Sequence, residues 1–253
     1  QEAALFDLGT IGFNRTDGKP MLKNPYGLQN DQIVTVDEVE RGRACNCTCP
    51  SCGAILEARK GALKVQHFAH ISGSECGFAV QTALHLMAKQ ILTEEKRIRL
   101  PELIADTPRS AYIVGTNPLK KEVVPRGYVQ RLDTVTLEKR IGDVIPDVLC
   151  EANGRKLIVE IYVTHAVDDI KLARLRNLDL GAVEFDFSKA DRLISKEELR
   201  EVLTRRYGLW GHGSSKWLHH PGLAAAVDQV EREYLEKNSP KPPTPQFKQR
   251  HLF

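Results

Sequence analysis

Residues 143–165 read DVIPDVLCEANGRKLIVEIYVTH, and this stretch decides the fold of the central part of the chain. Two apolar runs flank Asn153-Gly154, a residue pair typical of the two-residue turn of a β-hairpin. We therefore expect antiparallel strands over residues 144–151 and 156–164.

Carboxylates on these two strands predict a divalent-cation site. Asp147 follows Pro146 on the first strand, and Glu160 lies on the second, where side chains alternate between the two faces. Asp143 shares a face with Asp147, so either aspartate is a candidate ligand. Mg²⁺ and Mn²⁺ take carboxylate oxygens and contact phosphate, and an activated water can then attack a phosphodiester. The alternative is that these acids are solvated charges on half-exposed strands.

Hydrophobic periodicity predicts further elements on both sides of the hairpin. These are a helix over 78–96, strands over 128–138 and 182–187, and helices over 168–178, from Ser195 to about 206, and from 223 to 234. Shorter features are turns at 14–18 and 24–27 and strands at 32–39, 63–66 and 111–114. The proline-rich, basic residues 239–253 read as a disordered tail. The fold class is therefore α/β in the mixed, α+β sense.

Metal-type ligands gather between residues 45 and 76, which hold five of the six cysteines. Cys49-Pro-Ser-Cys52 is followed by a glycine, and His67-Phe-Ala-His70 comes fifteen residues later. This spacing predicts a structural zinc ion held by Cys49, Cys52, His67 and His70, with no open position for catalysis. Cys76 competes for the fourth place.

The remaining cysteines of this region, Cys45 and Cys47, are interpreted as small residues in a turn. Clustering at metal spacing fits a reducing cytoplasm, and a disulfide framework in a secreted protein is the alternative. A catalytic zinc with a bound water is a second alternative, which would need a vacant coordination position.

The helix expected over 78–96 carries a polar stripe, because Gln81, His85 and Lys89 lie four residues apart. The stripe either faces solvent or lines the cleft that holds the acids.

Composition limits the function classes. The chain has 253 residues, of which 42% are hydrophobic and 27% charged, and a net charge of +3, which is too small to argue nucleic-acid binding by itself. No run approaches the roughly 18 apolar residues of a membrane span. No secretory signal is visible, although the sequence begins at Gln1, and we expect a cytoplasmic protein.

Together these stretches resemble the competence protein CoiA-like family, whose members are similar to PD-(D/E)XK nucleases. The matching segments are CPSCGAILEARKGALKVQHFAH (49–70), QTALHLMAKQIL (81–92), residues 143–165, AVEFDFS (182–188) and WLHHP (217–221). The resemblance runs from Cys45 to Pro221, and the order of the motifs makes it specific. It implies a restriction-endonuclease-like core of helix, three-strand meander, helix and strand, with a zinc ribbon.

The resemblance also implies roles for individual residues. Asp147 and Glu160 match the two metal-binding acids. The lysine position holds Tyr162, so we expect Lys171 on the next helix to supply the cation from a shifted origin. His165 is a further candidate, although strand alternation puts it opposite Glu160 unless the strand ends first.

Two positions on the first helix complete the expected site. Gln81 stands where such enzymes often carry a glutamate, and it adds no charge to a metal. With His85 it would bind water or phosphate. The expected domains are a β-containing segment (1–44), a zinc module (45–77), a nuclease-like core (78–190), a helical region (191–238) and the tail.

The implied function is Mg²⁺- or Mn²⁺-dependent hydrolysis of DNA, more than RNA, in competence or phage defence. The alternative is a non-catalytic, zinc-dependent nucleic-acid-binding module with a degenerate nuclease fold.

Overall fold

The fold is described from a computed structural model. It covers residues 15–16, 19–20, 23–73, 76–107, 118–191, 193–205 and 214–238. The strand predicted at 111–114 and the tail at 239–253 lie outside the described residues. In the part of the chain that is described, no helix is long and apolar enough to cross a membrane.

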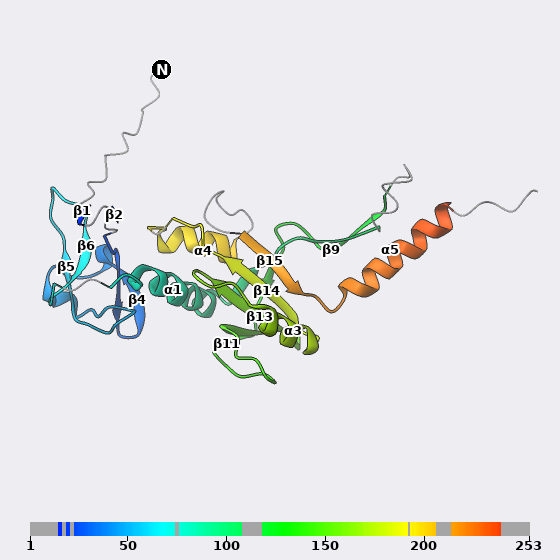
Figure 1. Ribbon diagram of the computed structural model, residues 1–253, viewed down its shortest axis with the longest axis horizontal. Helices are drawn as coiled ribbons and strands as arrows, with labels where there is room; N and C mark the ends of the chain where they lie inside the picture. Colours follow the sequence, from blue (N-terminus) through cyan, green and yellow to red (C-terminus); the bar gives the residue numbers. More distant parts are fainter. Residues whose placement is uncertain are drawn as a thin grey trace, which may run out of the picture.

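A mixed five-stranded sheet forms the centre of the molecule (Figure 1). Its strand order is β11 (Thr134–Leu137), β12 (Val148–Ala152), β13 (Arg155–Tyr162), β14 (Gly181–Asp186) and β15 (Ser214–His219). Neighbouring strands are antiparallel except β13 and β14, which are parallel. A parallel pair needs a crossover, and helix α3 (Asp169–Asn177) supplies it. The fold is thus mixed α+β, as the periodicity predicted.

Helices cover the two faces of this sheet unequally. On one face, α1 (Ala79–Glu95) and α4 (Lys196–Thr204) pack against the apolar side chains of β13 and β14, such as Val159 and Phe185. On the other face, α3 packs Leu175 against Ile158 and Ala182.

The β12–β13 hairpin turns at Asn153 and Gly154, which both have positive φ (51° and 72°), as the sequence predicted. The first strand, however, begins at Val148 and not at residue 144. Ile141 and Val144 close a separate turn by mutual backbone hydrogen bonds, and Pro146 has no N–H to give to a ladder.

The strand predicted over 128–138 was wrong as one element. It is divided into β10 (Val129–Arg131), which pairs with β7 (Arg97–Arg99), and β11 in the central sheet. The change of partner occurs at Leu132, whose N–H donates to the carbonyl of Lys96 (2.9 Å).

The N-terminal part is built of hairpins. β1 (Arg15–Thr16) pairs with β2 (Lys19–Pro20), and β3 (Tyr26–Gln29) pairs with β4 (Gln32–Thr35). The turn predicted at 24–27 was wrong, because the chain turns at Asn30-Asp31, where φ is 50° and 60°. Residues 14, 17 and 18 of the other predicted turn lie outside the described residues.

Two short strand predictions in this part also need correction. The strand predicted over 32–39 ends at Thr35, because Thr35 and Glu38 form a capping box that opens the 3-10 helix Val36–Glu38. Residues 63–66 form no strand, and Leu63 is 98% exposed. A second 3-10 helix spans Arg43–Cys45, and the hairpin of β5 (Leu56–Arg59) and β6 (His67–His70) follows.

The N-terminal hairpins are fastened to the helices of the core. The N–H of Ile33 donates to Oε1 of Gln90 on α1 (2.8 Å). The hydroxyl of the buried Tyr26 donates to the carbonyl of Ile194, just before α4. Cys76 leads directly into α1, since the N–H of Ala79 donates to its carbonyl (3.2 Å).

A third part was not predicted as a unit. The hairpin of β8 (Leu103–Asp106) and β9 (Lys120–Val124) packs against α5 (Leu223–Asn238) through Ala105, Ala226 and Val230. In Figure 1 these elements lie on the opposite side of the central sheet from the N-terminal hairpins.

Candidate active site and candidate metal centre

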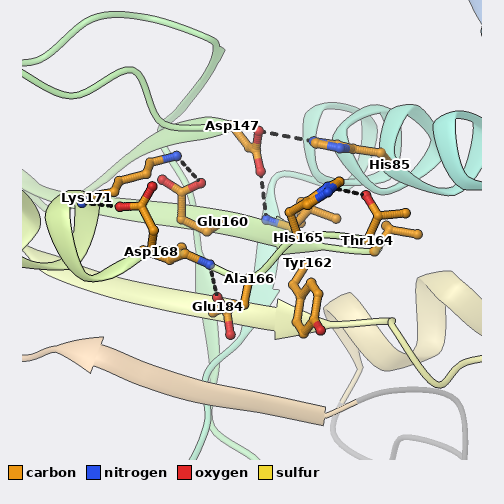
Figure 2. Close-up of a pocket in the computed structure, with 13 residues that line it drawn as sticks. His85, Asp147, Glu160, Tyr162, Thr164, His165, Ala166, Asp168, Lys171 and Glu184 are labelled. Atoms are coloured by element: carbon orange, nitrogen blue, oxygen red, sulfur yellow. Dashed lines mark hydrogen bonds and ion pairs between the residues drawn. The ribbon is translucent and has the colours of Figure 1, made fainter.

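Asp147 lies immediately before β12, at the edge of a cleft of about 270 Å³ (Figure 2). Its Oδ2 accepts a hydrogen bond from the backbone N–H of Ile161 (2.8 Å), which fixes the carboxylate beside β13. Its Oδ1 faces Nε2 of His85 (3.1 Å) and Nζ of Lys89 (3.5 Å) on α1. The acid is therefore held between the sheet and the first helix.

These contacts keep Asp147 ionised. Burial alone would raise its pKa, but His85, the Ile161 N–H and Lys89 together outweigh burial and lower the pKa to about 2. At neutral pH the carboxylate is charged and able to bind a cation.

The polar stripe of α1 borders this cleft. His85 lines it directly, and Gln81, His85 and Lys89 line an adjoining hollow of about 380 Å³. Lys89 is buried and bridges Asp147 and Glu138, whose Oε1 lies 2.8 Å from its Nζ. Oε1 of Gln81 is buried and has no hydrogen-bond partner among the described residues.

Glu160 is the second acid of the cleft. It lies on β13, its residue is 3% exposed, and its Oε2 accepts from Nζ of Lys171 (2.7 Å). Burial raises the pKa of Glu160 to about 7, because it outweighs Lys171, and the charge of Asp147 adds to the rise. Oε1 of Glu160 is buried without a partner in the described structure.

Lys171 reaches Glu160 from the first turn of α3. Asp168 caps this helix, since its Oδ1 accepts from the backbone N–H of Lys171 (2.6 Å). Lys171 thus binds the helix cap through its backbone N–H and Glu160 through its side chain. The position at which α3 begins therefore determines where the ammonium group lies.

Tyr162 and His165 line the same cleft as the two acids. β13 ends at Tyr162, so His165 lies in the loop beyond the strand and escapes the alternation that would turn it away. Its Nδ1 lies 2.9 Å from the hydroxyl of Thr164.

Asp143 is not part of the cleft. Because no strand runs through residues 143–147, the expectation that it shares a strand face with Asp147 was wrong, and it is exposed in the turn that Ile141 and Val144 close.

Glu184 is a further acid of the cleft that the sequence reasoning did not assign to the site. It is 1% exposed on β14. In the parallel pairing of β13 and β14 it lies directly opposite Glu160. The available signal was a charged residue inside the apolar run AVEFDF.

A second cluster lies in the N-terminal hairpins. Cys49, Cys52 and His70 place three ligand atoms within 4.8 Å of one another, so the cluster could hold a metal ion such as zinc. The glycine after Cys52 has a φ of 71° and donates its N–H to the carbonyl of Cys49 (2.9 Å), which folds the two thiols together. Sγ of Cys52 lies 3.3 Å from Nε2 of His70.

His67 does not belong to this cluster, contrary to the predicted ligand set. The segment His67–His70 is strand β6, where residues three apart point to opposite faces. Nδ1 of His67 instead lies 2.9 Å from the carbonyl of Val65.

Cys76 lies beside the cluster. Its thiol interacts with Ser51 and with the thiols of Cys49 and Cys52, and these contacts lower its pKa. Cys45 and Cys47 are instead fully buried with apolar neighbours such as Phe68.

Residues 32–79 match the family model described as Competence protein CoiA, N-terminal domain. This match supports the resemblance to the CoiA-like family over the N-terminal segment. The matched CoiA segment begins at β4, ends at the first residue of α1, and contains the whole cysteine and histidine cluster. The acids of the cleft lie beyond it. No curated protein and no solved structure matches the chain.

Proposed function

We propose that this CoiA-like chain is a divalent-metal-dependent nuclease that hydrolyses phosphodiester bonds in DNA, with Asp147 and Glu160 as the metal-binding acids. The observation that carries the proposal is that both carboxylates line one cleft and that Lys171 contacts Glu160 in it. Carboxylates, a cation and room for a phosphate are the components that such hydrolysis requires.

The donor set fits a hard divalent ion. Asp147 is ionised at neutral pH, and Glu160 has one oxygen that is buried without a partner. Mg²⁺ and Mn²⁺ are commonly bound by one or two carboxylates, with waters and phosphate oxygens completing the shell. When bound, such an ion offsets the negative charge that develops on the phosphate and lowers the pKa of a coordinated water.

The other cleft residues have complementary tasks. Lys171 would donate to a phosphate oxygen or to the attacking water once Glu160 binds the metal ion. His85 orients Asp147 from α1, and His165 and Tyr162 offer further donors from the loop and the end of β13. Gln81, with its free buried oxygen, would order a water in the adjoining hollow.

The order of the elements supports the same proposal. The helix α1, the antiparallel strands β11, β12 and β13, the helix α3 and the parallel strand β14 follow one another along the chain. This is the order that the resemblance to PD-(D/E)XK nucleases implies. The match of residues 32–79 to the N-terminal domain of a competence protein makes DNA the expected substrate, in a cytoplasmic setting.

For the metal centre we propose a structural zinc ion, with Cys76 as the fourth ligand in place of His67. The thiol of Cys76 is near enough to Cys49 and Cys52 for their side chains to lower its pKa. Four protein ligands would close the coordination shell, as structural zinc sites require. This ion would hold the hairpins that brace α1.

A cleavage assay on labelled single- and double-stranded DNA and RNA, with Mg²⁺ or Mn²⁺, tests the proposal. Asp147→Asn and Glu160→Gln should each lower the rate at least about a hundredfold, the scale of losing one preorganised charge. Asp143→Asn is the matched control, because this exposed residue lies four positions from Asp147 and outside the cleft.

The rival function is zinc-dependent nucleic-acid binding without cleavage, on a degenerate nuclease fold. Gln81, which stands in α1 where an acid is expected, favours it. Binding of DNA that survives Asp147→Asn, together with no cleavage by the unaltered protein, would establish the rival and overturn the nuclease proposal.

A further inference from the structure

We propose that Glu184 is a third acid of the cation site in the cleft, and that Lys216 is its counter-cation when no metal is bound. The inference rests on the proposed nuclease function and extends it, because Glu184 would supply the charge that Gln81 does not.

The sheet itself places Glu184 at the site. In the parallel pairing of β13 and β14, Glu160 and Glu184 are direct partners, so both point to the same face. Adjacent strands lie about 5 Å apart, which lets two carboxylates in one row contact the same ion. Glu184 also lines the cleft that contains Asp147 and Glu160 (Figure 2).

The row continues on both sides of this pair. Val148 pairs with Val159 in the antiparallel β12–β13 ladder, so Asp147 comes next to Glu160 at the end of that ladder. On the other side, Glu184 pairs with Lys216 of β15. Three acids and one cation thus cross the end of the sheet in order.

Burial shows that this arrangement is costly without a cation. Glu160 is 3% exposed and Glu184 is 1% exposed, and like charges at paired positions of a sheet repel each other. Acids buried this deeply are rare unless they are paired or bind a metal.

Each of the two acids now depends on a lysine from a different element. Oε2 of Glu160 contacts Lys171, and Oε1 of Glu184 lies 2.8 Å from Nζ of Lys216. Lys216 is itself 62% exposed, so it can swing into solvent. Oε1 of Glu160 is buried without a hydrogen-bond partner among the described residues and is therefore available to a cation.

The three acids do not form a closed cage. Among the described residues, just Cys49, Cys52 and His70 have three ligand atoms within 4.8 Å of one another. An open row suits an ion that keeps waters and shares its shell with a phosphate.

Glu184 also fixes the loop that carries His165. Its Oε2 accepts a hydrogen bond from the backbone N–H of Val167 (3.1 Å). Glu184→Gln preserves an oxygen that can accept this bond, so it removes the charge and retains the anchor.

The test measures Mn²⁺ binding to zinc-loaded protein by titration calorimetry, with the electron paramagnetic resonance of free Mn²⁺ as a second readout. Glu184→Gln should weaken Mn²⁺ affinity about tenfold or more, the scale seen when groups around a metal are removed. Lys216→Met should strengthen it, because the carboxylate loses its competing cation. Glu122→Gln, the same change at an exposed position on β9, should bind as the unaltered protein does.

The outcomes separate the two proposals. If Asp147→Asn abolishes Mn²⁺ binding while Glu184→Gln binds as tightly as the unaltered protein, the assignment of Glu184 is overturned and the nuclease site stands. If Asp147→Asn has no effect on binding, the cation site itself is wrong. Should Glu184→Gln fail to fold, Lys216→Met decides, since unchanged or weaker binding in that variant contradicts the inference.

Discussion

Oδ2 of Asp147 lies 2.8 Å from the backbone nitrogen of Ile161, the residue that follows Glu160 on β13. The hydrogen bond connects the side chain of Asp147 to the backbone next to Glu160, and not to the side chain of Glu160. Mutation of either acid should therefore leave the backbone that positions the other acid in place, and that independence makes charge-removing variants interpretable.

Zinc content should separate the two histidines of β6. We expect one zinc ion per chain by elemental analysis, and His70→Ala and Cys52→Ser should both lose it, because these residues form the cluster. The same substitution at His67 should retain zinc, since His67 contacts Val65 instead. Because structural zinc contributes directly to folding, the zinc-free variants should also unfold at lower temperature. Zinc loss in His67→Ala would contradict the ligand set.

Glu160 should make the metal-free cleft less stable as pH rises. Its folded-state pKa of about 7 lies above the ordinary value of 4.5, so the folded protein retains a proton that the unfolded chain releases between these values. Stability should therefore fall from about pH 4.5 to 7, and the loss is complete above 7.

The measurement is urea unfolding of zinc-loaded protein at several pH values without Mg²⁺ or Mn²⁺. Glu160→Gln removes the cost, so it should raise the free energy of unfolding at pH 8 by on the order of 3 kcal/mol and leave it unchanged at pH 4. The Lys171 side chain is 30% exposed, so its ammonium group can be hydrated when residue 160 is a neutral glutamine. A Glu160→Gln protein less stable than the original at pH 8 would mean that the ion pair is net stabilising.

Lys171 should act in cleavage where Tyr162 cannot. Lys171→Met removes the ammonium group that contacts Glu160 and should lower the cleavage rate at least about tenfold. Lys156→Met, on the exposed start of the same β13 strand, is the control and should cleave normally. If Lys171→Met cleaves at the full rate, Lys171 does not supply the positive charge for cleavage, and another residue of the cleft must do so.

The start of α3 should matter for activity beyond its effect on stability. Asp168→Ala removes the cap that holds the backbone of Lys171 and should cost about 1 kcal/mol of stability. Ser195→Ala removes the equivalent cap of α4 at a similar cost. At a temperature where both variants are folded, we expect Asp168→Ala to cleave more slowly and Ser195→Ala to cleave at the normal rate. Equal rates would show that the cap serves stability alone.

The sequence predicted the elements that local patterns define. The Asn153-Gly154 turn, the helix that became α1 and the capping box at Ser195 all depend on neighbours within a few residues. The C-x-x-C knuckle with its glycine is equally local, and it led directly to Cys49 and Cys52.

The errors arose where tertiary pairing overrides local pattern. One apolar run became β10 and β11, because its two halves pair with β7 and β12. The apolar run AVEFDF shows a charged residue at Glu184, but its position opposite Glu160 follows from the register of β13 and β14, which the local pattern does not reveal. The ligand role of His67 failed because its spacing was read without the period of a strand.

The attachment of the N-terminal hairpins to α1 has a practical consequence for inhibitors. Gln90 of α1 accepts from the N–H of Ile33, and the carbonyl of Cys76 accepts from the N–H of Ala79, the first residue of α1. His85 of the same helix contacts Asp147. With both proposed ions bound, a chelator such as EDTA would thus act twice, on the ion proposed for the cleft and on the proposed zinc, whose loss would loosen α1. Restoring Mg²⁺ alone should then fail to rescue a protein stripped of both ions, whereas zinc followed by Mg²⁺ should succeed.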